Sequence, residues 1–282
     1  MHQDEAVTAT AGAAAAGGAL AAAVRLEQGT YSDAYPERTP TLTLQGYRGY
    51  RANLINYGEG LAECAFAFIS GSPRRRGIRG QSEAREENEK RASRRAASKV
   101  RRLVLTGKLD TLLTLTYRDN VTGFEVTAAH IARFERTVRA KYPLWKCVAV
   151  PERQKRGAWH WHLAVPGWQD VAFLRATWRT IAGEGNIDLA PPRRPRGHRL
   201  VALARYLAKY LTKGFAEGRV LNRHRYRASR GIEIPLQVIP LRVRTLDAAL
   251  EAVRALVAGV AGTAGYEFVD DEHASGIVFS WG

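Results

Sequence analysis

The stretch Gly157-Ala158-Trp159-His160-Trp161-His162-Leu163-Ala164-Val165 decides the fold prediction for this chain. Its aromatic and apolar residues predict a β-strand over 159–165, in which successive side chains point to opposite faces. The bulky face belongs against helices and carries Trp159, Trp161, Leu163 and Val165. The opposite face carries Ala158, His160, His162 and Ala164. Two imidazoles are therefore presented among small neighbours on one face of the strand.

Histidines at positions i and i+2 of a strand lie side by side, close enough to share one metal ion. The candidate third ligand is Glu152, which lies at the end of the preceding strand of a hairpin. Strict alternation places it on the face of Val148 and Val150, which we expect to be core. Pro151 could break the ladder and turn Glu152 over; otherwise Gln154 is the substitute ligand. The competing interpretation is an exposed histidine pair without function.

The segment LVALARYLAKYLTKGF, residues 200–215, predicts a helix that carries two tyrosines. Tyr206 and Tyr210 are four residues apart and share one helical face, and Lys209 and Lys213 each follow a tyrosine by three residues. A separate leucine stripe can reach the core. A phenol beside a lysine and a metal-bound phosphate can act as a nucleophile on a phosphodiester. The competing interpretations are amphipathic core tyrosines and ordinary solvated lysines.

The surrounding segments predict an α+β fold with the element order β-α-β-β-α-β-α. We expect an antiparallel sheet with helices packed on one face, and we expect Trp161 and Trp178 in its core. The expected strands are 112–117, 146–150, 159–165 and 186–189, and the expected helices are 127–142, 167–182, 200–215 and 246–260.

Composition restricts the class of protein. The chain has 282 residues, 45% of them hydrophobic, with a net charge of +16, which is typical of a globular protein with a polyanionic partner. It has two cysteines, Cys64 and Cys147, too few for a disulfide framework or a four-cysteine zinc site, so we expect a reducing, cytoplasmic setting. The sequence contains no apolar run of membrane-spanning length and no P-loop motif, so we expect no membrane partner and no nucleotide cofactor.

A strongly basic segment covers residues 74–102, where twelve basic residues face four acidic ones. Its few apolar residues argue against a buried helix. It is interpreted either as a solvated linker or as a phosphate-binding helix whose affinity falls with salt. The candidate DNA-binding residues are Arg74, Arg75, Arg76, Arg94, Arg95, Arg101, Arg102 and Arg156.

Four regions are predicted. Residues 1–72 form a partly disordered, Ala-rich N-terminal region with candidate strands at 41–44 and 65–69, and residues 73–102 form the basic linker or helix. Residues 103–245 form the domain with the histidine pair and the tyrosines, and residues 246–282 form a C-terminal helix and tail.

Three motifs in order resemble rolling-circle replication initiators of the HUH endonuclease superfamily, in its two-tyrosine subgroup, from plasmids and single-stranded DNA phages. The first is the strand Leu112-Leu113-Thr114-Leu115-Thr116. The second combines Glu152, Arg156-Gly157 and His160-Trp161-His162, and the third is Tyr206-x-x-Lys209-Tyr210-x-x-Lys213. The resemblance covers roughly residues 103–215.

The resemblance implies a five-stranded sheet with the histidine pair at its centre and the tyrosine helix across the metal site. It implies a divalent ion, Mg²⁺ or Mn²⁺, with Zn²⁺ left open because two imidazoles and a carboxylate also suit it. One tyrosine would attack single-stranded origin DNA and keep the 5′ phosphate, while a host polymerase and helicase act at the freed 3′-hydroxyl in the bacterial cytoplasm. The alternatives are a transposase, a relaxase, or a non-catalytic DNA-binding regulator of the same fold.

Overall fold

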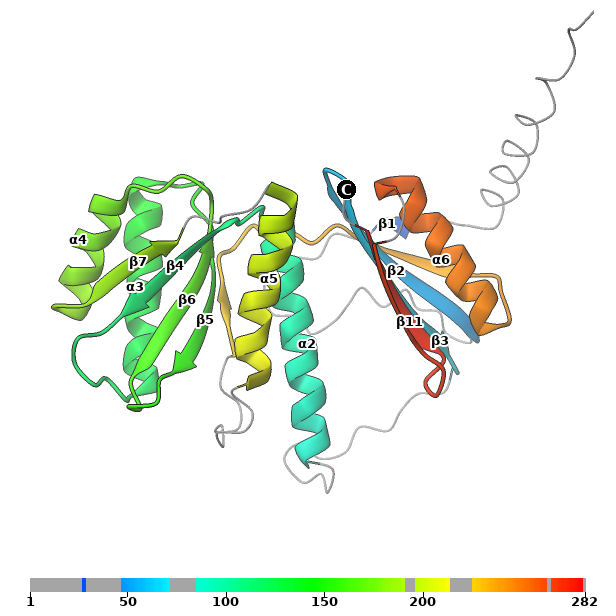
Figure 1. Ribbon diagram of the computed structural model, residues 1–282, viewed down its shortest axis with the longest axis horizontal. Coiled ribbons are helices and arrows are strands. Elements are labelled where there is room, and N and C mark those ends of the chain that lie inside the picture. Colours follow the sequence, from blue (N-terminus) through cyan, green and yellow to red (C-terminus); the bar gives the residue numbers. More distant parts are fainter. Residues whose placement is uncertain are drawn as a thin grey trace, which may run out of the picture. The chain divides into compact units, whose positions relative to one another are not determined.

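The computed structural model describes residues 27–28, 47–71, 85–190, 196–213, 225–262 and 265–280. They form two compact units, each built around its own antiparallel sheet (Figure 1). The predicted Ala-rich arm, the candidate strand 41–44 and the residues Arg74, Arg75 and Arg76 lie outside the described residues.

In the first unit, six of the described strands form a sheet in the order β1-β9-β2-β3-β11-β10. Helix α6 packs on one face of it, on a core that includes Leu54, Phe66 and Val253. The structure thus joins residues 47–71 and 246–280, assigned to different regions in the sequence analysis, because β2 and β3 pair with β9 and β11. The bounds are β1 Glu27–Gln28, β2 Gly49–Gly58, β3 Leu61–Ile69, β9 Leu236–Leu241, α6 Leu246–Ala261, β10 Tyr266–Asp270 and β11 Ser275–Ser280.

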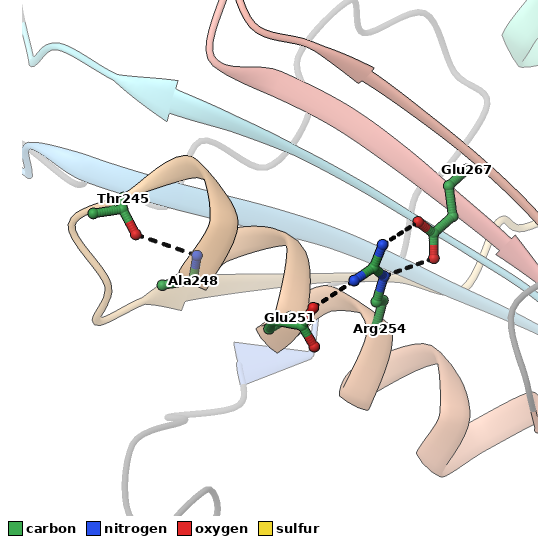
Figure 2. A network of polar contacts seen from close by, with 5 residues as sticks. All are labelled: Thr245, Ala248, Glu251, Arg254 and Glu267. Atoms are coloured by element: carbon green, nitrogen blue, oxygen red, sulfur yellow. Dashed lines mark hydrogen bonds and ion pairs between the residues drawn. The ribbon is translucent and has the colours of Figure 1, made fainter.

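Polar contacts fix helix α6 at its start and along its length (Figure 2). The Thr245 hydroxyl accepts a hydrogen bond from the Ala248 backbone N–H at 3.2 Å, which caps the helix. The Arg254 guanidinium donates from Nε and Nη2 to the two carboxylate oxygens of Glu267 on β10, at 2.8 and 2.7 Å, and also pairs with Glu251. This two-pronged geometry sets the orientation of α6 relative to β10.

In the second unit, five of the described strands form a sheet in the order β7-β4-β6-β5-β8, with β6 at the centre. Helices α3 and α4 lie on one side of this sheet and α2 and α5 on the other (Figure 1). The predicted α+β class is confirmed, and β6 has the predicted limits. The bounds are α2 Arg85–Thr106, β4 Thr111–Thr116, α3 Phe124–Lys141, β5 Val148–Arg153, β6 Trp159–Val165, α4 Val171–Ala182, β7 Asn186–Ala190, α5 Arg196–Lys213 and β8 Arg227–Ala228.

The bulky face of β6 packs in the predicted core. Trp161 and Leu163 meet Ile131 and Phe134 of α3 and Trp178 of α4 in one buried cluster. The prediction that Trp161 and Trp178 are core residues is confirmed, since they are 3% and 0% exposed. This packing fixes the orientation of β6 and therefore the direction in which its histidines point.

The histidine face of the sheet is covered as well. Val148 and Val150 on β5 are fully buried, and helix α5 contacts β5 and β6. The predicted leucine stripe of α5 is confirmed as buried, and it consists of Leu200, Leu203, Leu207 and Leu211. Burial of this stripe leaves the tyrosine face of α5 available for the histidines.

Helix α2 corrects the expectation for the basic segment. Arg91, Arg94 and Arg95 are exposed, but Val100 and Leu103 are buried, and α2 packs along α5. The helix continues through Leu103-Val104-Leu105, so its second half has the apolar residues that the basic segment lacks.

A buried serine ties α2 to the end of the tyrosine helix. The Ser93 hydroxyl donates to the Leu211 carbonyl oxygen at 3.1 Å and accepts from Arg225 Nη1 at 2.7 Å. We expect Ser93→Ala to lower the free energy of unfolding by about 1–3 kcal/mol, because two buried partners lose a hydrogen bond. Urea unfolding measures this, with Ser98→Ala on the same helix as the control. Equal, small changes in both variants would contradict a role of Ser93 in fixing α5.

Candidate functional site

The histidine pair lies on the central strand, under helix α5. His162 is paired with Thr114 of β4 on one side and with Val150 of β5 on the other, and His160 is paired with Glu152. The centres of the two imidazole rings are 6.2 Å apart. His162 is only 5% exposed, whereas His160 is half-buried at the rim.

Glu152 reaches the histidines without the expected break in the ladder. The register of β5 and β6 runs unbroken through Pro151, so the suggestion that Pro151 turns Glu152 over is wrong. Glu152 shares a face with Val148 and Val150, as strict alternation requires, and Glu152 Oε2 lies 2.8 Å from His162 Nε2. The conflict disappears because this face also has a core, supplied by α2 and α5.

Gln154, the substitute ligand, is engaged in the turn after β5. Its side-chain oxygen accepts from Arg156 Nε at 3.0 Å. Arg156 also donates to the backbone oxygens of Tyr117 and Arg118, at 2.9 and 3.2 Å. The guanidinium of this predicted DNA-binding residue therefore braces the β5–β6 turn against the end of β4.

Thr114 completes the polar contacts of His162. Its hydroxyl lies 3.3 Å from His162 Nδ1, while Nε2 faces Glu152. A neutral imidazole has one donor and one acceptor nitrogen, so the arrangement fits a hydroxyl that donates to Nδ1 and an Nε2–H that donates to the carboxylate. The sequence analysis quoted Thr114 only within a strand motif; its place opposite His162 depends on the register between β4 and β6.

The two tyrosines of α5 contact His162. The Tyr210 ring stacks on the imidazole at 4.5 Å between ring centres and 16° between planes, whereas the Tyr206 ring meets it edge-on at 5.9 Å and 82°. The Tyr210 hydroxyl donates to the Tyr206 hydroxyl oxygen at 2.5 Å. Two phenols, an imidazole and a carboxylate thus form one continuous cluster.

The two phenols differ in their surroundings. Tyr206 is 39% exposed, and Tyr210 is half-buried. Burial raises the pKa of Tyr210, and the hydrogen bond to Tyr206 and the charge of Glu152 raise it further. Burial lowers the pKa of His160, and the neighbouring His162 and Arg156 also lower it, against an opposing effect of Glu152. A neutral His160 keeps a nitrogen lone pair available for a cation.

The remaining predicted site residues surround this cluster or lie beyond the described side chains. Lys209 precedes Tyr210 and is exposed. Lys213 is the last residue of α5, and its side chain lies outside the described part of the chain. On α2, Arg94 and Arg95 are exposed, while Arg101 and Arg102 are half-buried.

The metal site stays a prediction. In the part of the chain that the structure describes, no three His, Cys, Asp or Glu side chains form a group placed to hold a metal ion. The donor set is nevertheless compatible with one. Imidazoles that share an ion have ring centres at most about 6.5 Å apart, because each nitrogen lies about 2.1 Å from the metal, and the observed 6.2 Å is within this limit.

Among the described helices, none combines the length and the apolar character that crossing a bilayer requires. Neither the curated proteins nor the solved structures contain a significant match to this chain. Residues 110–215, which include β4, β5, β6 and α5 with the whole cluster, match the family model of the replication-associated proteins of the ORF2 type, and this match supports a replication initiator.

Proposed function

We propose that this chain is a metal-dependent, site-specific nicking and rejoining endonuclease of the HUH type that initiates rolling-circle replication on single-stranded DNA. The observation that carries the proposal is the cluster on the central strand, where both phenols contact His162 and Glu152 lies 2.8 Å from it. The matched family supports the biological role, since replication initiation requires a free 3′-hydroxyl on the template's partner strand.

The chemistry is a transesterification at phosphorus. A tyrosine oxygen forms a bond to the scissile phosphorus, and the bond from phosphorus to the 3′-oxygen breaks. The electron pair stays on the 3′-oxygen, which takes up a proton, and the phenol loses its proton to solvent. The products are a 5′-phosphotyrosine ester and a 3′-hydroxyl for a host polymerase. A divalent cation bound by His160, His162 and Glu152 would stabilise the negative charge on the phosphate.

Tyr206 is assigned as the first nucleophile. It is the more exposed phenol, and its oxygen accepts the hydrogen bond from the Tyr210 hydroxyl. A donor held at 2.5 Å stabilises negative charge on the Tyr206 oxygen before attack. Tyr210, stacked on His162, supports this first cut, and once Tyr206 is esterified it is the phenol left to make the terminating cut.

The proposal is tested by covalent capture. The protein is incubated with a labelled single-stranded oligonucleotide that contains the origin and with Mn²⁺, and the products are separated on a denaturing gel. We expect a band of DNA-linked protein that a chelator prevents. DNA binding without any linked band would favour the alternative, a non-catalytic DNA-binding regulator.

Thr114 is assigned to positioning His162. We expect Thr114→Val, which keeps the shape of the side chain, to weaken Mn²⁺ binding by about 10-fold or more, because it removes the hydrogen bond that orients the imidazole. Calorimetric titration of Mn²⁺ into the free protein measures this. Thr116→Val is the matched control, since the Thr116 hydroxyl donates to the Asn186 backbone oxygen instead. Equal Mn²⁺ affinities in both variants would rule out the assigned role.

A further inference from the structure

Two loops at one end of the second unit's sheet expose large apolar side chains. Trp168, after β6, is 76% exposed, and Leu144, before β5, is 89% exposed. The loops are joined next to these residues, because Trp145 Nε1 donates to the Gln169 side-chain oxygen at 2.9 Å. The Trp168 ring also meets the Tyr142 ring edge-on at 6.5 Å. The exposed tryptophan is therefore part of a small aromatic platform, defined here as Tyr142, Leu144 and Trp168.

The loop that carries Trp168 is held by many polar contacts. The Gln169 amide nitrogen donates to the Pro166 backbone oxygen at 2.6 Å, and Thr111 donates to the Gly167 oxygen at 3.2 Å. Asp170 caps α4 and accepts from the Tyr142 hydroxyl at 2.8 Å. An indole presented to water on a braced loop loses little conformational freedom when a ligand covers it.

Charge indicates the class of ligand. Residues 139–146 and 166–175 include four basic residues, Arg139, Lys141, Lys146 and Arg175, and a single acid, Asp170. Lys141 Nζ lies 3.0 Å from the Asp170 carboxylate, so this acid is already neutralised. An aromatic platform in a net positive setting matches single-stranded nucleic acid, whose bases stack on aromatic rings while its phosphates meet cations.

We propose that the aromatic platform binds an unpaired base of single-stranded DNA, with Trp168 as the stacking surface. This inference rests on the proposed function, which supplies the DNA. The platform follows β6 directly. At about 3.3 Å per residue, the four residues from His162 to Pro166 span about 13 Å, so one strand of a few nucleotides can reach both the tyrosines and the platform.

The test measures binding and chemistry separately. We expect Trp168→Ala to weaken binding of a labelled single-stranded oligonucleotide, measured by anisotropy with a chelator present, by about 5- to 100-fold, the effect of losing one stacked base. Trp168→Phe keeps an aromatic ring and should bind within about 3-fold of the parent. The control is Val126→Ala, another exposed apolar residue, on α3. The yield of covalent adduct at saturating DNA should be unchanged in all three variants.

Each outcome has a distinct meaning. Equal DNA affinity of Trp168→Ala and the parent overturns the platform, even where the parent forms the covalent adduct. An affinity loss together with no adduct from the parent supports the platform and contradicts the nicking proposal. If Trp168→Ala changes the sedimentation coefficient but not the DNA affinity, the platform is a protein–protein interface and the inference is wrong.

Discussion

Tyr206→Phe is expected to lower the initial rate of covalent DNA–protein adduct formation by about 10³-fold or more, because the attacking oxygen is removed. Tyr210→Phe is expected to lower it by about 10-fold, because only the hydrogen bond to the Tyr206 oxygen is lost. The double variant should form no adduct. The rates are measured with the labelled oligonucleotide and Mn²⁺ on denaturing gels.

Phe preserves the ring contacts with His162, so loss of folding is not expected in either single variant. Their circular dichroism spectra should match that of the parent, and both should bind single-stranded DNA with unchanged affinity. Adduct formation that persists in the double variant would refute tyrosine as the nucleophile. A larger loss in Tyr210→Phe than in Tyr206→Phe would reverse the assigned order and leave the proposed chemistry intact.

His160→Ala is expected to reduce nicking by about 10²-fold or more while leaving DNA affinity in the presence of a chelator unchanged. The side chain lies at the rim of the cluster, half-buried, so its removal takes away a predicted metal ligand with little loss of core packing. Mn²⁺ affinity, measured calorimetrically on the free protein, should fall in parallel with nicking.

His130→Ala is the matched control, because this half-exposed histidine lies on α3 and contacts Tyr117. It should keep both nicking and Mn²⁺ affinity. Parallel losses of DNA binding and nicking in His160→Ala would point to a structural histidine. Full nicking in His160→Ala, or nicking in the parent that survives exhaustive chelation, would contradict the metal-site prediction.

Local patterns were sufficient for several features of the second unit. The alternation in residues 159–165 predicted which β6 side chains are core and which face α5, and Trp161 and His162 lie as expected. The four-residue spacing of Tyr206 and Tyr210 placed both rings on one helical face, and the rings are in contact. Such patterns succeed because the periods of strands and helices are fixed by backbone geometry alone.

Other features depended on pairing between distant segments. The position of Glu152 was questioned because a single buried face was assumed, whereas α2 and α5 bury Val148 and Val150 on the second face. The role of Thr114 follows from its register opposite His162, forty-eight residues away. The pairing of β2 with β9, which joins residues 49–58 to 236–241, had no signal in either segment.

By itself, therefore, the sequence determined the limits of β6, the faces of β6 and α5, and the types of residue available for chemistry, because these depend on neighbours along the chain. The tertiary structure alone decided that Glu152 and Thr114 hold His162 from two sides, and that Tyr210 stacks on it while Tyr206 stays exposed. These arrangements depend on strand register and on the docking of α5, which arise from packing between segments far apart in the sequence.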